Sequence, residues 1–579
     1  MATAGRGRAA GVGWLGCLAV LGGCVDLAEA PHTGTAGSLA FVGQRVLPSQ
    51  QVGASSRKPA VLWENCATEL AQNHPSAQCA TFALPLDPAL PDATQLPVHV
   101  QKIPARGVRR GQLWLLAGGP GGAGSDMAWF AEAMSFLDTG LDVMVPDHRG
   151  TGGSARLACP AEEAISSEGS RSITAGEWPS CLASLADVWG GDLRHFTTTA
   201  AAHDLRALLA ATREPGDLVY VYGVSYGTYW AQRWLHLDPA GADGVILDSV
   251  CPAQGCTVAQ YDAQFDTAAG DLLDLCAGDA ECAQQLGDQP EKRARDILDR
   301  LDAGHCPALA PLGVDRKRVR NILGVLLTVW ELRTYLPAIL HRIDRCEPAD
   351  IEALGVLASL FAPPAAGLAM EPSRRSLPLG NHILLSEMYA DGPGPSPGAL
   401  QAASEQAIAS LDAVAPLAQL HGGWPRYRPD DLVGTFPQTQ VPMLLLAGTL
   451  DPQTPLAFAQ AAAARFRAPN QRLIILPGAA HGTVVASPVQ SSDQDCGLQL
   501  TLGFLQAPTQ APDLSCIDDL KPVDFQGEML VSMALFGTPD TWSPTWPDAA
   551  AAANARAASP RMMQRLRAAI AEQESRGER

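Results

Sequence analysis

Residues Asp217–Trp230 read DLVYVYGVSYGTYW, and this stretch decides the fold. Its first part, Leu218–Tyr222, is a short apolar run rich in β-branched and aromatic residues, which predicts a buried strand. The chain then passes through Gly223–Gly227 (GVSYG) into a helical pattern that Pro239 ends. Strand, G-x-S-x-G and helix in succession predict a nucleophile elbow, a turn so tight that only glycine lets the neighbouring backbone pass. We therefore expect the Ser225 hydroxyl to stand at the carboxyl end of a strand.

A second stretch of the chain, Gly394–Gly398 (GPSPG), also satisfies G-x-S-x-G. Prolines flank its serine, Ser396, and no apolar run precedes it, so this segment predicts a loop. The nucleophile is therefore assigned to Ser225.

A glycine-rich turn, Gly118–Gly124, directly follows the predicted strand Leu113–Ala117. A phosphate-binding loop would need the Lys and Ser/Thr of a P-loop or the spacing G-x-G-x-x-G, and the turn has neither. It suits an oxyanion hole, because backbone N–H groups with no Cβ beside them can approach a substrate oxygen. The expected donors are the N–H of Gly119 and that of Tyr226, the residue after the nucleophile.

An acid and a histidine follow the last two predicted strands. Asp451 comes after Val441–Ala447, and His481 comes after Leu473–Leu476. The order Ser, Asp, His is typical of enzymes built on this elbow. We expect His481 to take the Ser225 proton and return it to the leaving amine, and Asp451 to fix the imidazole tautomer and stabilise the imidazolium. This chemistry requires no metal and no organic cofactor.

His148 is the competing candidate for the base, in the turn after the predicted strand Leu141–Pro146. We interpret it as structural, because a polar tight turn needs internal hydrogen-bond partners. Pairing of Asp147 with Arg149 is the expected anchor of that turn.

Three motifs together resemble those of the prolyl and tripeptidyl aminopeptidase family of α/β-hydrolases, the S33 serine peptidases. They are GGPGG at 118–122, DHRGTGGS at 147–154 and YGVSYGTYWAQRW at 222–234. Ala117 stands where the family's HGGPG motif usually begins with His, as is common in the tripeptidyl branch. The resemblance implies an α/β-hydrolase fold, with a mostly parallel central sheet, helices on both faces and a largely helical cap insertion. It also implies a peptide substrate, cleaved near its N-terminus.

The resemblance also points to Glu387, which falls where relatives carry an acidic residue at the return to the sheet. It implies that Glu387 binds the α-ammonium group of the substrate and so fixes how far from the N-terminus the peptide is cleaved. The alternative is a solvated or salt-bridged glutamate.

The expected organisation of the chain follows from these motifs and from the helical pattern between the two halves of the sheet. The segments are 1–30, an export signal; 31–58, a flexible lead; 59–250, the first part of the hydrolase core; 251–425, a helical cap; 426–525, the second part of the core; and 526–579, a C-terminal extension with a terminal helix. Residues 524–542 are expected to finish the hydrolase domain.

The first thirty residues predict export, because a basic start precedes the short apolar stretch Ala9–Gly23. Leu21–Cys24 (LGGC) resembles a lipobox, which predicts a lipid anchor on Cys24 as the only link to a membrane. Ala28–Ala30 (AEA) is a rival cleavage site that predicts release without lipid. The expected location is the cell envelope, as a lipoprotein, or the medium, as a secreted protein.

Cysteine usage fits export. Two of the 14 cysteines lie in the signal region, which leaves an even number of 12. Neighbours in sequence are Cys66 with Cys79, Cys159 with Cys181, Cys251 with Cys256, Cys276 with Cys282 and Cys496 with Cys516, and Cys306 with Cys346 is a possible sixth pair. Spacing leaves the connectivity open, but disulfides are favoured over zinc, since the sequence has no C-x-x-C pair and no H-E-x-x-H.

Composition narrows the function classes. A formal charge of −19 argues against a nucleic-acid partner, because binding phosphates needs a basic face. A hydrophobic content of 47% is enough for a packed core. The hypothesis is an exported serine aminopeptidase; a carboxylesterase or lipase with the same triad is the alternative within enzymes, and an inactive envelope binding protein is the alternative outside them.

Overall fold

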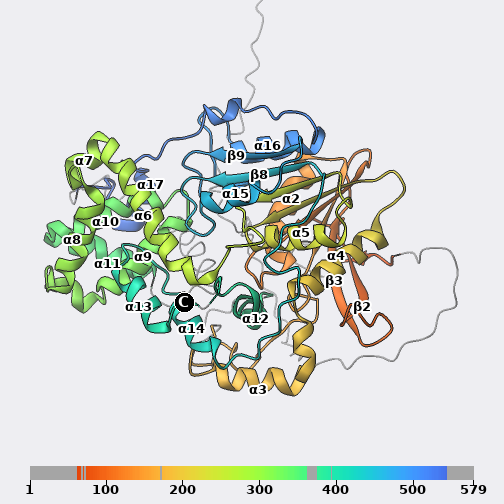
Figure 1. Ribbon diagram of the computed structural model, residues 1–579. Helices are drawn as coiled ribbons and strands as arrows, with labels where there is room; N and C mark the ends of the chain where they lie inside the picture. Colours follow the sequence, from red (N-terminus) through yellow and green to blue (C-terminus); the bar gives the residue numbers. More distant parts are fainter. Residues whose placement is uncertain are drawn as a thin grey trace, which may run out of the picture.

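One nine-stranded sheet forms the centre of the described part of the chain (Figure 1). The computed structural model describes residues 61–66, 70, 74–169, 172–361, 374–392 and 394–543. The predicted export signal, Cys24 and the predicted terminal helix lie outside the described residues. Among the described helices, none combines the length and the apolar run that a bilayer crossing requires.

The strands follow the order β1-β2-β3-β5-β4-β6-β7-β8-β9 across the sheet. The first three strands pair antiparallel, β3 also pairs antiparallel with β5, and all other pairs are parallel. Their bounds are β1 (Glu64–Asn65), β2 (Gln78–Pro85), β3 (Gln95–Ile103), β4 (Gly111–Leu116), β5 (Leu141–Pro146), β6 (Leu218–Val224), β7 (Gly244–Asp248), β8 (Met443–Gly448) and β9 (Gln471–Leu476). The predicted mostly parallel sheet is therefore confirmed, and the carboxyl ends of β4–β9 share one edge, where sheets of this kind bind ligands.

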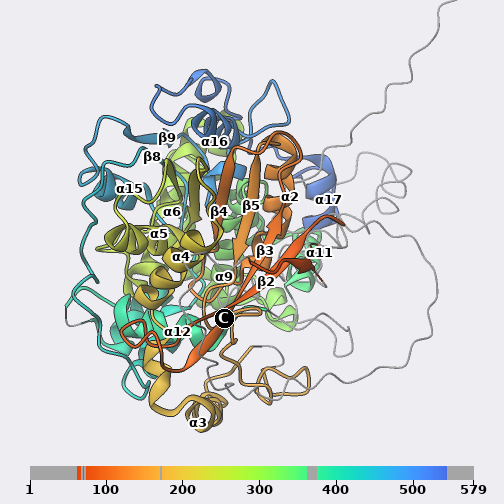
Figure 2. The same cartoon turned by 90° about the vertical axis from the view of Figure 1, so that its right-hand side faces the viewer.

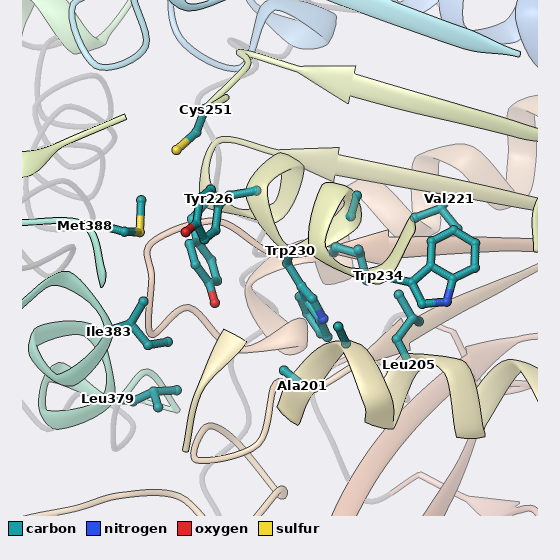
Figure 3. Close-up of a cluster of buried hydrophobic side chains, with 14 of the residues drawn as sticks. Ala201, Leu205, Val221, Tyr226, Trp230, Trp234, Cys251, Leu379, Ile383 and Met388 are labelled. Atoms are coloured by element: carbon teal, nitrogen blue, oxygen red, sulfur yellow. The ribbon is translucent and has the colours of Figure 1, made fainter. Parts of the chain in front are cut away.

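Helices cover both faces of the sheet, which is why its central strands read as continuous apolar runs. Leu113 and Leu115 of β4 belong to a buried cluster with α2 (Ala128–Leu137) and α16 (Cys496–Gln506). Trp114 and Leu116 point to the other face and pack with α4 (Thr198–Thr212) and α5 (Tyr226–Leu237). Figure 2 shows α2 on one side of the strands and α4 and α5 on the other. In Figure 3, Trp230 and Trp234 of α5 face Ala201 and Leu205 of α4, and all four side chains are buried.

The chain between β7 and β8 forms a group of helices beside the sheet, which we call the cap (Figure 1). Its helices are α6 (Tyr261–Gly278), α7 (Ala280–Leu286), α8 (Pro290–Asp302), α9 (Arg316–Thr328), α10 (Leu336–Arg345), α11 (Pro348–Leu360), α12 (Leu377–Glu387), α13 (Pro397–Gln406) and α14 (Val414–His421). Helices α6–α11 share a buried apolar cluster that is separate from those on the two faces of the sheet. The cap therefore has a core of its own.

Two further α-helices and several short 3-10 turns lie outside this set. They are α3 (Trp178–Trp189) and α15 (Leu456–Ala463), with 3-10 turns η1 (Gly124–Met127), η2 (Gly190–His195), η3 (Val258–Gln260), η4 (Pro307–Leu312), η5 (Arg333–Tyr335), η6 (Thr483–Val485) and η7 (Ser515–Ile517).

Residues 524–542 pack on the cap, so the expectation that they finish the hydrolase domain is wrong. Helix α17 (Met529–Phe536) contributes Val531 and Leu535 to the buried cluster of the cap. The buried guanidinium of Arg342 in α10 donates a hydrogen bond to the backbone carbonyl of Thr541 at 2.8 Å. This segment covers the apolar face of α10 and α11. The sequence of the segment itself does not indicate that it packs there.

Six disulfides are present, and each joins one of the pairs of cysteines named above: Cys66–Cys79, Cys159–Cys181, Cys251–Cys256, Cys276–Cys282, Cys306–Cys346 and Cys496–Cys516. The disulfide prediction is confirmed, including the sixth pair. Within the described residues, no group of three or more His, Cys, Asp or Glu side chains is arranged to hold a metal ion.

Candidate active site

Ser225 lies between β6 and α5 with φ +56° and ψ −125°, a backbone conformation that residues with a side chain rarely adopt. The two glycines of the motif explain how the turn closes. A Cβ on Gly227 would lie 2.1 Å from the carbonyl oxygen of Leu116, and one on Gly223 would lie 2.4 Å from that of Gly227. Both positions therefore exclude any side chain, and the turn has the geometry that a nucleophile elbow requires.

Ser396, the serine of the second G-x-S-x-G match, has a different setting. It precedes α13, is exposed, and its hydroxyl accepts a hydrogen bond from the Ala399 N–H at 3.2 Å. Its geometry is that of a helix N-cap.

Asp451 and His481 form a hydrogen-bonded pair, with His481 Nδ1 2.9 Å from Asp451 Oδ2 and 3.0 Å from Oδ1. The buried carboxylate also accepts the Thr454 hydroxyl at 2.7 Å and the N–H groups of Gln453 and Thr454 at 2.9 Å. Burial alone would raise the pKa of Asp451, but His481 and these hydrogen bonds outweigh it and lower the pKa below its usual value. A charged Asp451 holds the proton on Nδ1 and leaves Nε2 free to accept another.

One pocket brings the predicted residues together. Ser225, Tyr226, His481 and the turn Gly118–Gly119 all line it. Its walls come from two parts of the chain: Trp129, Phe130, Tyr222 and Phe458 from the sheet side, and Tyr261, Gln264, Leu384, Met388 and Leu417 from the cap side. Figure 3 shows Tyr226, Cys251 and Met388 of this wall. The pocket is thus a largely apolar space with a few polar groups near the serine, as ligand sites commonly are.

The glycine turn approaches the serine closely. A Cβ on Gly118 would lie 3.1 Å from the Cβ of Ser225. Gly119 has φ +121°, and a Cβ there would lie 2.8 Å from the Gly122 nitrogen. Tyr226 is the first residue of α5, so its N–H has no partner within the helix. The two predicted oxyanion donors therefore lie on backbone that borders the same pocket.

Comparison with known proteins agrees with this geometry. A family described as "alpha/beta hydrolase fold" matches residues 113–281, and one described as "TAP-like protein" matches residues 417–516. The "Tripeptidyl aminopeptidase" of Streptomyces lividans is 29% identical over 224 residues, 34% of this chain and 39% of that protein. The chain has the α/β-hydrolase fold, and its sequence is similar to that of tripeptidyl aminopeptidases. The match spans about two fifths of the length of that relative.

Other similar proteins differ in their described activities. The chain is 35% identical over 111 residues to "Carboxylesterase B" of Mycobacterium tuberculosis, a match that covers 18% of this chain and 21% of the relative. A solved proline iminopeptidase of Mycobacterium smegmatis aligns with 70% of this chain and 93% of its own at 17% identity, with a TM-score of 0.29. That structural likeness carries no argument about function.

The structure does not place Glu387 at the pocket of this α/β-hydrolase, and the predicted role in holding the substrate amine is corrected. The side chain is fully buried and is not among the residues that line the pocket. Its oxygens accept hydrogen bonds from four internal donors: Arg233 Nη2 at 3.1 Å, Tyr427 OH at 2.6 Å, Tyr229 OH at 3.2 Å and Thr198 Oγ1 at 2.5 Å. With its charge paired and its acceptors taken, Glu387 acts as the salt-bridged glutamate of the alternative interpretation.

Glu387→Gln is expected to lower the free energy of unfolding by about 3–5 kcal/mol, because it leaves the buried Arg233 charge without its partner. Urea unfolding followed by circular dichroism measures the loss. The control is Asp296→Asn, which removes the exposed Lys292–Asp296 pair and should cost little stability, because solvent screens this pair. Equal losses in the two variants would contradict the buried-pair interpretation.

The turn after β5 is anchored differently from the prediction, and the expected Asp147–Arg149 pair is wrong. Arg149 pairs with Asp204 of α4, with nitrogen–oxygen distances of 2.6 and 2.7 Å. Asp147 instead accepts two backbone N–H groups at 2.8 Å. His148 is buried, with Nε2 3.2 Å from Tyr226 OH, and burial lowers its pKa to about 4. It is neutral at pH 7 and does not line the pocket, which supports its structural interpretation.

Sequence reasoning missed Thr454, whose hydroxyl binds the Asp451 carboxylate and lies 3.2 Å from His481 Nδ1. A signal was present, since a threonine three residues after an aspartate in D-P-Q-T is typical of a turn that closes on the carboxylate. It also missed Asp248 and Ser249, which the sequence presents only as the end of a buried strand.

Proposed function

We propose that this hydrolase is an exported serine aminopeptidase that releases short peptides or single residues from the N-terminus of a peptide through an acyl-enzyme on Ser225. One observation carries the proposal: the serine of a strained strand-to-helix turn, a hydrogen-bonded His481–Asp451 pair and a glycine turn all border a single pocket. These are the groups that acyl transfer needs.

In the proposed mechanism, Nε2 of His481 removes the hydroxyl proton as Ser225 Oγ attacks the peptide carbonyl. Negative charge moves to the carbonyl oxygen, where the N–H groups of Gly119 and Tyr226 receive it; such a donor is worth about 3 kcal/mol. The imidazolium, held by Asp451, then gives its proton to the leaving amine. Water repeats the cycle on the ester and frees Ser225.

Asp126 is the proposed contact for the substrate amine in place of Glu387. Of the described residues that line the pocket, it is the one that bears a carboxylate, and its side chain is 41% exposed. It lies on η1, directly after the glycine turn, with Oδ2 3.8 Å from Nε of Arg375. A free N-terminus entering the pocket would meet this carboxylate, whereas Glu387 lies behind the wall that Tyr226 forms.

Peptide amides with a free N-terminus are therefore expected to be cleaved at least about tenfold faster than their N-acetylated forms, the factor for a hydrogen bond to a charged group of about 1.5 kcal/mol. The measurement is kcat/KM for matched free and blocked peptides of increasing length. Asp126→Asn should remove the preference and Glu387→Gln should keep it. Equal rates on free and blocked peptides in the wild type would refute the aminopeptidase proposal.

A carboxylesterase is the second candidate, because the similarity to "Carboxylesterase B" covers part of the chain and the same triad would serve it. Adding esters to the same substrate panel separates the two, since cleavage of esters alone would assign an esterase. An inactive binding protein is tested by a fluorophosphonate probe, which should form an adduct on Ser225; a protein that takes no label would be left with binding only.

Export and a lipid anchor on Cys24 remain proposals, supported by the sequence of the first thirty residues and by the six disulfides, which persist in oxidising compartments. Mass spectrometry of the mature N-terminus tests them. A chain that starts at unmodified Pro31 would rule out the anchor.

A further inference from the structure

A second buried carboxylate lies close to the candidate histidine. Asp248 is the last residue of β7, and both it and the following residue, Ser249, have no exposed surface. The mechanism proposed above does not use either side chain. Their contacts connect three parts of the site.

Asp248 is bound to the strand that leads to the nucleophile. Its backbone carbonyl accepts the N–H of Ser225 at 3.0 Å, and its Oδ2 accepts the hydroxyl of Tyr222 at 2.7 Å. Tyr222 belongs to β6 and lines the pocket. A change at Asp248 should therefore affect the positions of Ser225 and Tyr222.

The same two residues hold the loop that carries the histidine. The three N–H groups that follow His481 all donate to them: Gly482 to Ser249 Oγ at 2.9 Å, Thr483 to Ser249 Oγ at 3.3 Å and Val484 to Asp248 Oδ2 at 3.2 Å. Ser249 has φ +53°, so its side chain is presented from a backbone conformation that residues with a side chain rarely adopt. Asp451 thus holds the imidazole, and the Asp248–Ser249 pair holds the backbone of the loop that carries it.

The titratable groups that face the Asp248 carboxylate are Tyr222 from β6, Asp451 after β8 and His481 after β9. Burial raises the pKa of Asp248 to about 6, while the hydrogen bonds from Tyr222 and Val484 and the charge of His481 act in the opposite direction. Asp248 is therefore mostly ionised at pH 7 and loses its charge as the pH falls through about 6.

We propose that Asp248 is a positioning residue that anchors the loop of His481 and places a second negative charge near its ring, in addition to Asp451. The imidazole becomes positive as the serine is deprotonated, and a fixed buried charge of opposite sign favours that state without reorganisation. This inference rests on the proposed function, because it takes His481 to be the base.

The test is Asp248→Asn in the full chain. An amide oxygen still accepts from Tyr222 and Val484, so the variant keeps these two contacts; it loses the charge and the acceptor for the Ser249 hydroxyl, which lies 3.4 Å from Oδ1. We expect kcat to fall about tenfold, the size of an interaction worth one pKa unit, with KM little changed. The acid limb of the kcat/KM profile should move to lower pH, because the Asp248 carboxyl, which loses its charge as the pH falls through about 6, no longer contributes to it. A purely structural role would not move this limb.

Two control variants separate charge from geometry. Ser249→Ala removes the acceptor for two N–H groups but keeps the Asp248 charge, so kcat should fall while the acid limb stays in place. Asp142→Asn changes another buried carboxyl, which accepts the Ala105 N–H at 2.8 Å at the opposite end of the sheet, and should leave the limb unmoved. A folded Asp248→Asn with the wild-type acid limb overturns the inference.

Tyr222→Phe tests the same idea if Asp248→Asn fails to fold. It removes a hydrogen bond that stabilises the charged carboxylate, so Asp248 should be neutralised at higher pH and the loss of kcat on acidification should begin at higher pH. An unmoved profile overturns the inference by this route too. The proposed function, in contrast, would be refuted if the wild type cleaved neither peptides nor esters and formed no fluorophosphonate adduct.

Discussion

Ser225→Ala is expected to lower kcat on a peptide amide by roughly 10⁶-fold, the scale found when the nucleophile of a serine peptidase is removed. The reason is that alanine has no hydroxyl, so the covalent step has no acceptor for the acyl group. Alanine has a Cβ like serine and is no more strained at φ +56°. The fold should therefore survive, which circular dichroism and the melting temperature can check.

The chain supplies a matched control for this prediction. Ser396→Ala changes the serine of the other G-x-S-x-G sequence, which is exposed and caps α13. Its activity should equal that of the wild type, with at most a small loss of stability from the missing cap. Turnover retained by Ser225→Ala would show that the wrong serine was chosen.

Asp451→Asn has the second largest expected effect, a fall in kcat of about 10⁴-fold, as found when the acid of a serine triad is made neutral. The amide can donate to Nδ1, which favours the imidazole tautomer that cannot accept the serine proton on Nε2. The loss should appear in kcat with the substrate still bound, because Asp451 is buried behind His481.

The control for Asp451→Asn is Asp513→Asn. Asp513 also accepts the N–H of the residue two positions on, at 2.9 Å, but in an exposed turn. Its replacement should leave kcat unchanged. A loss of less than about tenfold in Asp451→Asn would assign the acid to another carboxylate, and Asp248 would be the first to examine.

Features that depend on neighbours in sequence could be predicted from the sequence. The central strands are apolar because helices cover both of their faces, and the two glycines beside Ser225 are required by backbone contacts inside the turn itself. Five of the six disulfides join cysteines at most 22 positions apart, so proximity in the chain found their partners.

Features that depend on partners far away in the chain could not be predicted from the sequence. Glu387 looks like a substrate contact until Arg233, 154 positions away, is found beside it. Arg149 has a carboxylate two residues before it, yet it pairs with Asp204, which the packing of α4 brings close. Helix α17 is apolar except for Ser532, and its sequence gives no sign of which core it joins. In each case the sequence names the group but not its partner.

The pocket has walls from two sources, with the reacting groups on the sheet side and α6, α12 and α14 on the cap side. In the proposed enzyme, the catalytic groups and the residues that contact the rest of the substrate would therefore come from different segments of the chain. Substitutions confined to those three helices are expected to change the substrate preference and to leave the proposed catalytic residues in place.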